Sequence, residues 1–473
     1  MHKLSFLKFK KGLKNKKVFV WGLGLNGGGE EAVKFFCRNG SKVFVVDSKS
    51  EEELRETVDR LKKFKVEYLF GPHDEKIFQE ADLVIKNPAI AWELPLVKKI
   101  ARKVEIETDV TLFFKFFKGK IFGVTGSKGK TTTTILLANA LKATGKKIVL
   151  GGNLRVSLFS FIKEKFLEDK KIIAVLELSS FQLEDLALVR RSPNVAIITN
   201  ILRDHLNRYG TYEKYISAKQ NICHFQSRED VKILNAGDKK LNYFEKCGKG
   251  RAVYFNGSGR NLNLKTGFFN VDEELFSVEK GKIRRILKIS NPILKTEVNL
   301  KNACAVAAGL NFFSKLSNCQ LENIFNKFKG VPYRMELVRK YKGINFVNDT
   351  AATIPDASIS AVKSVEGNQI LIAGGADKNL KFNQWAGLVS KKVKFLVLFK
   401  GTASAKIKKA LGKQKKKISF QEVSNMDKAV KLAYKKAVKG DTILLSPGCA
   451  SFGIFKNEFD RGDQFNQAVK NLR

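Results

Sequence analysis

Acidic residues, paired cysteines and long apolar runs are scarce in this sequence, and each shortage excludes a class of protein. The chain has 46 Asp and Glu against 87 Lys and Arg, so its formal net charge is +41. The six cysteines form no CxxC pair, which argues against a structural zinc site and for a reducing compartment. No stretch approaches the roughly 18 apolar residues that a membrane-spanning helix needs.

The first residues also lack the apolar centre of a secretion signal. The opening "MHKLSFLKFKKGLKNKK" is interrupted by lysine throughout. We therefore expect a cytoplasmic protein with no membrane association. At 473 residues and 44% hydrophobic content, the chain is long enough for about two to four domains with substantial cores.

The positive charge is compatible with two kinds of protein. Clustered lysine and arginine suit nucleic-acid binding, because they neutralise backbone phosphates. Here the basic residues are dispersed, and no RNA-recognition, zinc-finger or helix-turn-helix pattern is present. We therefore expect solvated basic faces that suit an anionic small substrate, and no nucleic-acid partner.

Three successive blocks alternate β-rich runs with helical stretches, a pattern typical of parallel sheets covered by helices. The first begins with "KKVFVWGLGLNGGG", the second with "IFGVTGSKGKTTTT" and the third near "KGVPYRMELV". No low-complexity tract or short repeat interrupts them. We predict an α/β fold with three domains, at residues 1–116, 117–330 and 331–473.

The second block opens with the composition of a phosphate-binding loop. A strand-like run leads into Gly126 and Gly129, which are followed by Lys130 and Thr131. Glycines let backbone N–H groups approach phosphate oxygens, and the N-terminus of a following helix favours negative charge. The lysine can reach the β- and γ-phosphates, and the threonine hydroxyl can ligate Mg²⁺. Val124 stands where the general GxxxxGK[ST] pattern has glycine, but a plain glycine turn does not explain the adjacent Lys-Thr.

The first block contains a second glycine loop, "GLGLNG". Gly22, Gly24 and Gly27 follow a strand-like run, and Asp47 ends the next one. This spacing matches the dinucleotide fingerprint. Alone it is weak, because a glycine turn needed only for close packing gives the same pattern. It indicates a nucleotide or sugar-phosphate at the end of this sheet without establishing NAD.

Three further residues of the second block follow predicted strands. Glu177 ends the apolar run "IIAVLE", where a nucleotide-binding sheet places a metal-ligating or water-ordering carboxylate. His205, one of four histidines, follows "VAIIT" in a polar turn and is a candidate metal ligand. Lys219 lies on a predicted helix, where a lysine is normally a solvated charge, and its spacing alone indicates no other role.

Together, "GVTGSKGKTTTT", "ELSSFQLE", "DHLNRY", "GVPYRMELV", "GGADK" and "LLSPGCASF" resemble the Mur ligases of peptidoglycan synthesis, most closely the members that add D-glutamate. The resemblance covers essentially the whole chain in the same order. It implies a Rossmann-like UDP-binding domain, a central P-loop ATPase-type domain and a C-terminal Rossmann-like domain that binds the amino acid. It implies ATP and Mg²⁺ as cofactors, and UDP-N-acetylmuramoyl-L-alanine and D-glutamate as substrates. We expect a monomer.

The resemblance also assigns site residues. The catalytic residues of the family match Lys130, Glu177, His205 and Lys219, and its metal ligands match Thr131, Glu177, His205 and, once carbamylated, Lys219. Its ATP contacts match Gly126, Ser127, Lys128, Gly129, Lys130, Thr131, Thr132, Asn302, Arg334 and Asp349. Its UDP-sugar contacts match Gly24, Leu25, Asn26, Gly27, Asp47, Asn87, Asn153, Ser179 and Gln182. Its D-glutamate contacts match Thr353, Lys378, Ser451 and Phe459.

Four positions depart from the family pattern. Ala351 stands where a lysine is usual, and Glu458 stands where an aromatic residue is frequent, with Phe459 one residue later. Val298 replaces a common histidine, and Asn87 a common serine. These changes bear on amino-acid recognition and nucleotide packing more than on phosphate chemistry.

The implied reaction is ATP-dependent amide-bond formation through an acyl phosphate. A related ligase that acts on another amino acid, including L-glutamate, or on folate is an alternative, because these enzymes share one core. A NAD-dependent dehydrogenase would use "GLGLNG" but leave the phosphate loop without a role. A nucleic-acid-stimulated ATPase would use the positive charge.

Overall fold

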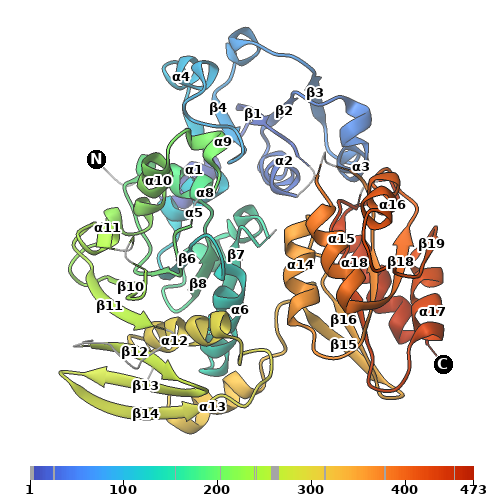
Figure 1. The fold of residues 1–473 in the computed structure, drawn as a ribbon. Helices are drawn as coiled ribbons and strands as arrows, with labels where there is room; N and C mark the ends of the chain where they lie inside the picture. The colour runs from blue at the N-terminus through green and yellow to red at the C-terminus, as the bar shows by residue number, and fades with distance from the viewer. Residues whose placement is uncertain are drawn as a thin grey trace. The chain divides into compact units, whose positions relative to one another are not determined.

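Three β-sheets organise the chain, and they lie in two compact units, Met1–Phe328 and Lys329–Arg473. The computed structural model (Figure 1) describes residues 5–24, 27–154, 156–202, 204–238, 240, 242–256, 266–313, 316–377, 380–451 and 453–472. The predicted α/β class with three sheet-based parts is confirmed. Among the described helices, none combines the length and apolar character that crossing a bilayer requires.

The first sheet has five parallel strands in the order β3-β2-β1-β4-β5. Its strands are β1 (Lys17–Trp21), β2 (Lys42–Asp47), β3 (Val66–Phe70), β4 (Leu83–Lys86) and β5 (Ile106–Glu107). The helices of this part are α1 (Phe6–Lys11), α2 (Gly28–Arg38), α3 (Glu51–Leu61), the 3₁₀ turn η1 (Glu75–Phe78), α4 (Pro95–Ala101) and α5 (Asp109–Phe116). The glycine loop of the first block therefore connects β1 to α2.

The second sheet has nine strands in the order β14-β13-β12-β11-β10-β9-β6-β8-β7. Its strands are β6 (Lys120–Thr125), β7 (Ile148–Gly152), β8 (Ile173–Glu177), β9 (Val195–Ile198), β10 (Val231–Asn235), β11 (Arg251–Asn256), β12 (Thr266–Val271), β13 (Glu274–Glu279) and β14 (Lys282–Lys288). Strands β6 to β12 run parallel to one another. Strands β13 and β14 extend the sheet in antiparallel orientation, which the sequence pattern of parallel strands does not predict.

Helices alternate with many of the strands of the second sheet along the chain. They are α6 (Lys130–Ala143), η2 (Leu158–Phe161), α7 (Glu164–Leu167), α8 (Ser180–Val189), α9 (Leu206–Tyr209), α10 (Tyr212–His224), α11 (Asn242–Glu245), α12 (Glu297–Asn311) and α13 (Asn318–Asn326). Helices α6 and α12 lie against one another (Figure 1). Helices α8 and α10 also pack together, and α8 contacts α5 of the preceding part.

One hydrophobic core joins the first two sheets within the first compact unit. Buried side chains of α5, among them Phe113 and Phe116, belong to the same cluster as Val20 of β1 and Ile198 of β9. Because this apolar cluster is continuous, the parts of the chain built on the first and second sheets pack into one compact unit. The domain boundaries at 116/117 and 330/331 stay predictions.

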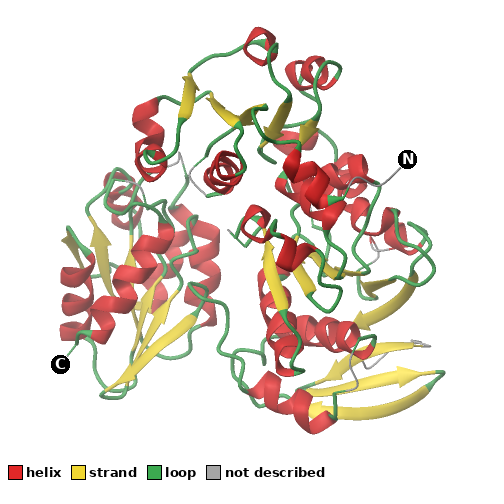
Figure 2. Ribbon diagram, turned by 180° about the vertical axis from the view of Figure 1, so that it is seen from behind, coloured by secondary structure: helices red, strands yellow, loops and turns green. Residues whose placement is uncertain are grey.

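The second unit has a six-stranded sheet between two helical layers (Figure 2). Its strands, in the order β15-β16-β20-β17-β18-β19, are β15 (Glu336–Tyr341), β16 (Ile344–Asn348), β17 (Gln369–Ala373), β18 (Val393–Phe399), β19 (Phe420–Val423) and β20 (Thr442–Leu445). Its helices are α14 (Pro355–Ser364), α15 (Asn383–Lys392), α16 (Ser404–Gly412), α17 (Met426–Lys436) and α18 (Glu458–Lys470). Only β15 is antiparallel to its neighbour among the described strands of this sheet.

Alternate side chains along the strands of this sheet point to its two faces, and each face forms a hydrophobic core with one layer of helices. In β17, Ile370 and Ile372 face the core formed with α17 and α18, whereas Leu371 and Ala373 face the core formed with α14, α15 and α16. Successive side chains of a strand point to opposite faces. A continuous apolar run is therefore what a parallel strand covered on both sides requires.

A fully buried arginine connects two loops of this unit by hydrogen bonds. The Arg461 guanidinium, on α18, donates from Nε to Thr350 Oγ1 (2.9 Å), from Nη2 to the Thr350 carbonyl (2.9 Å) and from Nη1 to the Cys449 carbonyl (3.2 Å). Burial lowers its pKa to about 10. It ties the loop after β16 to the loop after β20, the two segments that contain Thr353 and Ser451 of the predicted amino-acid contacts.

We expect Arg461→Met to destabilise the second unit by about 3 kcal/mol, because it leaves several buried acceptors without a donor. Urea unfolding followed by circular dichroism, with hydrogen exchange of the β20 amides to assign the change to this unit, measures the effect. Lys470→Met, at an exposed position of the same helix, is the control and should be nearly neutral. Equal stability of the two variants would contradict the structural role of Arg461.

Candidate active site

The phosphate loop lies between β6 and α6, in the middle of the central sheet. Two of its glycines have backbones that other residues rarely adopt, with φ of 149° at Gly126 and 83° at Gly129. A Cβ at Gly126 would lie 1.9 Å from Thr199 Oγ1, and one at Gly129 would lie 2.6 Å from Asn302 Oδ1. Both positions therefore require glycine for conformation and for space.

Hydrogen bonds from the loop after β9 hold the phosphate loop in shape. Thr199 Oγ1 donates to the Lys128 carbonyl (2.6 Å), and Asn200 Oδ1 accepts from the Lys128 N–H (2.9 Å). Ser127 Oγ donates to the Leu202 carbonyl (3.1 Å). These bonds fix the loop before any ligand binds, so its backbone N–H groups are preorganised.

Two lysine ammonium groups converge on this loop from different helices. Lys130 Nζ donates to the carbonyls of Gly126 (2.9 Å) and Ser127 (3.1 Å). Lys219 Nζ, from α10, donates to the Gly126 carbonyl (3.2 Å) and to Thr125 Oγ1 (3.2 Å). The structure thus places the helix lysine, whose sequence spacing indicated no role, directly beneath the phosphate loop.

Lys219 is almost completely buried, with 2% of its surface exposed. Burial, together with the nearby Lys130 ammonium, lowers its pKa to about 7. A large fraction of this amine is therefore neutral at physiological pH, in contrast to an ordinary solvated lysine. The Tyr215 ring lies 4.9 Å from Nζ, and the Tyr215 hydroxyl lies 3.0 Å from Ser127 Oγ.

Glu177 ends β8 beside the phosphate-loop strand, in register with Val124. Its carboxylate is 2% exposed, and Oε1 accepts a hydrogen bond from Asn153 Nδ2 (2.8 Å). Oε2 is buried and has no hydrogen-bond partner among the described residues. A buried carboxylate oxygen without a donor suits a hard cation such as Mg²⁺, which prefers oxygen ligands.

His205 lies in the turn before α9 with a left-handed backbone (φ 51°). Its side chain is about half exposed, and its ring lies 5.0 Å from the Phe181 ring. Burial lowers the pKa of His205, and the charges of Lys219, Lys130 and Arg208 lower it further, whereas Asp204 opposes them. A neutral imidazole is the form that binds a metal.

The predicted metal set contains only two residues of the usual ligand types, Glu177 and His205. Accordingly, among the described residues no three His, Cys, Asp or Glu side chains converge to hold a metal ion. The unpartnered Glu177 oxygen and the lowered pKa of the His205 imidazole fit a Mg²⁺ ion, but the predicted set would also need Thr131 and a carbamate on Lys219.

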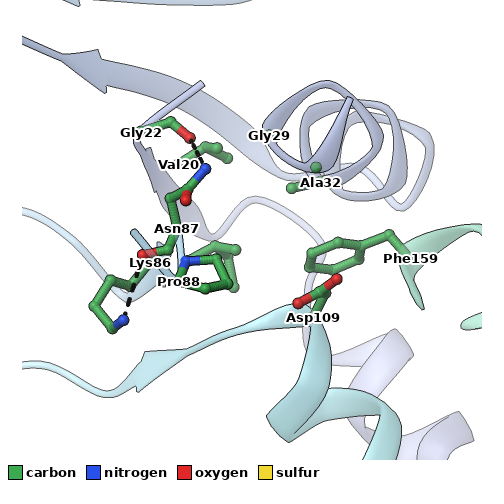
Figure 3. A pocket seen from close by; sticks show the side chains of 11 residues that line it. Val20, Gly22, Gly29, Ala32, Lys86, Asn87, Pro88, Asp109 and Phe159 are labelled. Atoms are coloured by element: carbon green, nitrogen blue, oxygen red, sulfur yellow. Dashed lines mark hydrogen bonds between the residues drawn. The ribbon is translucent and has the colours of Figure 1, made fainter. Parts of the chain in front are cut away.

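A separate pocket lies at the glycine loop of the first sheet (Figure 3). It is a small, partly open cavity of about 40 Å³ between α2 and the loop after β4. Its lining residues include Gly22, Gly28 and Gly29 of the glycine loop and α2, and Asn87 and Pro88 of the loop after β4. Asn87 Nδ2 donates to the Gly22 carbonyl (3.2 Å), so the predicted substrate loop is bonded to the glycine loop itself.

The other predicted UDP-sugar residues are spread over both parts of the first unit. Asp47 is 7% exposed and accepts from the Gly24 N–H (3.3 Å), which places it at the glycine loop. Ser179 and Gln182 cap α8 reciprocally. Gln182 Oε1 therefore has a structural role in addition to the predicted contact. Gly27 begins α2 with φ 83°, and Leu25 and Asn26 lie outside the described residues.

The remaining predicted ATP contacts divide between the two units. Ser127, Lys128, Thr131 and Thr132 belong to the phosphate loop or the first turn of α6, and Asn302, on α12, lies beside Gly129. In the second unit Asp349 follows β16 and accepts from Ser446 Oγ (2.8 Å). Burial raises the pKa of Asp349 to about 6, and the nearby Arg334 opposes this.

Of the predicted D-glutamate residues, Thr353 and Ser451 lie on loops after parallel strands of the second unit, and Phe459 lies in the first turn of α18. Thr353 is partly buried in the loop between β16 and α14, and Ser451 is 2% exposed in the loop after β20. Phe459 packs edge-on against Tyr333, with ring centroids 5.2 Å apart. Lys378 lies outside the described residues.

Several residues that shape the site have no sequence signal of their own. Thr125, Thr199 and Tyr215 contact the phosphate loop or Lys219, and Arg461 fixes the loops of the second unit. Threonine after a strand is common, so only the tertiary contact distinguishes these positions. The "RG" of the third block contains Arg461, but the motif does not reveal that the side chain is buried.

Comparison with known proteins decides the family. Residues 16–108 match a model described as Mur ligase MurD-like, N-terminal domain, residues 124–310 match the Mur ligase middle domain, and residues 333–449 match the Mur ligase, glutamate ligase domain. The UDP-N-acetylmuramoylalanine--D-glutamate ligase of Roseiflexus sp. is 36% identical, covering 97% of this chain and 99% of the relative. That of Alkaliphilus oremlandii is 35% identical, covering 98% and 99%.

The chain belongs to the Mur ligase family. Solved Mur ligases share its fold: UDP-N-acetylmuramate-alanine ligase MurC of Thermotoga maritima has a TM-score of 0.60 at 21% identity, covering 97% of this chain and 100% of that one. MurF ligase of the same organism, in complex with ADP, has a TM-score of 0.53 at 17% identity, covering 97% and 98%. The predicted resemblance is confirmed.

In this Mur ligase we expect Gly126→Ala to weaken ATP binding at least tenfold, because the added methyl group meets Thr199 and strains a backbone reserved for glycine. Isothermal titration with ATP measures the loss. Gly412→Ala is the matched control, since a Cβ there meets no atom within 4 Å. ATP binding by Gly126→Ala at the wild-type affinity would show that the loop geometry is not required.

The buried Lys219 amine also predicts a pH effect on stability. In the unfolded chain it keeps its proton up to its usual pKa of 10.5, whereas in the folded protein it loses it near 7. Between these values the unfolded state binds more protons, so wild-type stability should rise with pH relative to Lys219→Met, by roughly 1 kcal/mol per pH unit just above 7. Urea unfolding of both proteins at pH 6.5–9 in carbonate-free buffer tests this, and parallel curves would contradict it.

Proposed function

We propose that this Mur ligase adds D-glutamate to UDP-N-acetylmuramoyl-L-alanine with ATP, forming ADP and phosphate, in cytoplasmic peptidoglycan precursor synthesis. The observation that supports it best is the phosphate loop with Lys130, Lys219 and Glu177 around it, in the same compact unit as a glycine-loop pocket. The D-glutamate ligases that match over nearly the whole chain supply the substrate identities.

The first chemical step joins the terminal carboxylate of the UDP-sugar to the γ-phosphorus of ATP. A carboxylate oxygen attacks in line, the bond to the β–γ bridging oxygen breaks, and ADP and an acyl phosphate result. Negative charge spreads over the transferred phosphoryl oxygens in the transition state. We assign the stabilisation of that charge to the N–H groups of the loop, the N-terminus of α6 and the Lys130 ammonium.

The second step forms the amide bond. The neutral amino group of glutamate attacks the acyl carbon, the bond to the phosphate oxygen breaks, and inorganic phosphate leaves with one proton lost from the amine. Thr353, Lys378, Ser451 and Phe459 are the proposed glutamate contacts. Arg334, Asp349 and Asn302 are the proposed nucleotide contacts outside the phosphate loop.

Mg²⁺, held by Thr131, Glu177, His205 and carbamylated Lys219, would neutralise phosphate charge during transfer. Carbamylation joins the Lys219 nitrogen to carbon dioxide with loss of one proton, and only the neutral amine reacts. The depressed pKa of Lys219 supplies that neutral form, and its burial shields the product from water. The change converts a buried cation into an anion that suits a divalent metal.

Carbon-13 NMR tests the carbamate. With ¹³C-bicarbonate we expect one protected carbamate resonance in the wild-type protein and none in Lys219→Met. Lys232→Met is the matched control, because Lys232 is equally buried but donates only to backbone carbonyls away from the loop. A resonance that persists in Lys219→Met would assign the modification to another residue.

An amino-acid panel tests the proposed reaction. ADP release should require UDP-N-acetylmuramoyl-L-alanine and D-glutamate together. Lys130→Ala should lower kcat by about 10²–10³, because a preorganised cation at the transferred phosphoryl group is lost. Turnover with L-glutamate, a diamino acid or a folate in place of D-glutamate would establish a related ligase instead, an outcome that the departures at Ala351 and Glu458 make worth testing.

A further inference from the structure

The loop that follows β4 connects the glycine-loop pocket to the central part of the chain. Its first residues, Asn87 and Pro88, line the pocket together with Lys86, the last residue of β4. The Lys86 ammonium is fully buried and donates to the carbonyls of Ile90 (2.9 Å) and Asn87 (3.3 Å). A buried cation therefore holds the backbone of the pocket loop (Figure 3).

The charge of Lys86 is balanced by a residue of the central part. Asp185, on α8, is also fully buried, and its Oδ1 lies 3.6 Å from Lys86 Nζ. The same oxygen accepts from Trp92 Nε1 (2.7 Å), and the Trp92 ring lies 4.5 Å from Nζ. Asp185 Oδ2 is buried with no hydrogen-bond partner among the described residues. The pair thus joins β4, the pocket loop and α8.

A second charged group fixes the same loop to the same helix. Arg208, on α9, donates from Nη1 to the Ala89 carbonyl (2.7 Å) and from Nη2 to Glu184 Oε2 (2.8 Å). Its guanidinium lies 3.9 Å from the centre of the Phe181 ring. Arg208 and Glu184 are only 10% and 11% exposed. The pocket loop is therefore connected to neighbouring residues of α8 at two points, directly through Asp185 and, through Arg208, to Glu184.

Helix α8 also reaches the proposed phosphoryl-transfer site. It begins three residues after Glu177, and Phe181 in its first turn packs against the His205 ring. The loop that lines the pocket is thus bonded to the helix that starts at the catalytic carboxylate. Through α8, the position of the pocket is fixed relative to the position of the phosphate loop.

Stability alone does not explain buried charges at this junction. Removing both ions from water costs several kcal/mol, and a hydrophobic pair of similar volume is often at least as stable. Here burial raises the pKa of Asp185 to about 6 and lowers that of Lys86. Both shifts show that burying the charged forms of these two side chains costs free energy. An ion pair with directed hydrogen bonds fixes the geometry of its partners, which an apolar contact does not do.

We propose that Lys86 and Asp185, supported by Arg208 and Glu184, are positioning residues that set the distance between the pocket for the uridine diphosphate end of the substrate and the site where its carboxylate is phosphorylated. The inference rests on the proposed function. Binding energy at one end of a substrate accelerates reaction at the other only if the two sites are held in register. An error of about 1 Å can lower the rate about 100-fold.

The test compares two substrates in four proteins. UDP-N-acetylmuramoyl-L-alanine carries the whole uridine diphosphate end that the pocket is proposed to hold, whereas 1-phospho-N-acetylmuramoyl-L-alanine lacks its uridine monophosphate part. The proteins are wild type, Lys86→Met, Asp185→Asn and the double variant. Asp185→Asn removes only the charge and keeps an acceptor for Trp92, so it remains informative if Lys86→Met folds poorly. Lys232→Met is the control for removing a buried lysine elsewhere in the unit.

We expect kcat with the complete substrate to fall 10- to 100-fold in each single variant, and kcat with the truncated substrate to change less than threefold. The double variant should be no worse than the poorer single variant, because the pair acts as a unit. Lys232→Met should affect both substrates equally, in proportion to folded protein.

Equal losses with both substrates in Lys86→Met and Asp185→Asn would overturn the positioning role and leave a structural one. Unchanged activity of Asp185→Asn with the complete substrate would overturn it as well. Wild-type turnover separates these results from failure of the proposed function: a wild-type protein with no activity on the complete substrate would reject the reaction, and the inference with it.

Discussion

The position of β6 between β8 and β9 is the constraint on which the first unit depends. Parallel strands end at a common edge of their sheet, and a strand with neighbours on both sides brings three loops together there. The phosphate loop follows β6, Glu177 is the last residue of β8, and Thr199 follows β9. Gly126 is the point of closest approach, since a single added carbon would overlap Thr199.

Burial then changes what ordinary side chains do at that edge. A lysine on a helix surface is a solvated cation, but Lys219 points under the phosphate loop, where the lost hydration favours the neutral amine. Glu177 keeps one oxygen without a donor in the same region. The packing of α10 and β8 therefore excludes water from both groups, which lowers the pKa of Lys219 and leaves one Glu177 oxygen without a hydrogen-bond donor.

The same apolar packing links the two sheets of the first unit. A continuous core through α5 holds the sheets together, and the polar junction of Lys86, Asp185, Arg208 and Glu184 lies beside it. Apolar contacts supply most of the attraction but are non-directional. Directed hydrogen bonds of buried charges add the geometry that a two-ended substrate needs. In the second unit Arg461 has a comparable role between two loops.

The sequence by itself determined the α/β class, the three strand-rich blocks, both glycine loops and the family, because these depend on local periodicity and on glycines that local backbone geometry requires. It did not predict the antiparallel strands β13 and β14, whose pairing is decided between segments rather than within them. The spacing of Lys219 in the sequence indicated no functional role for it, and no sequence pattern singled out Lys86, Asp185 or Arg461. Only the tertiary structure decided those, because a charge becomes functional through the burial and partners that distant segments give it.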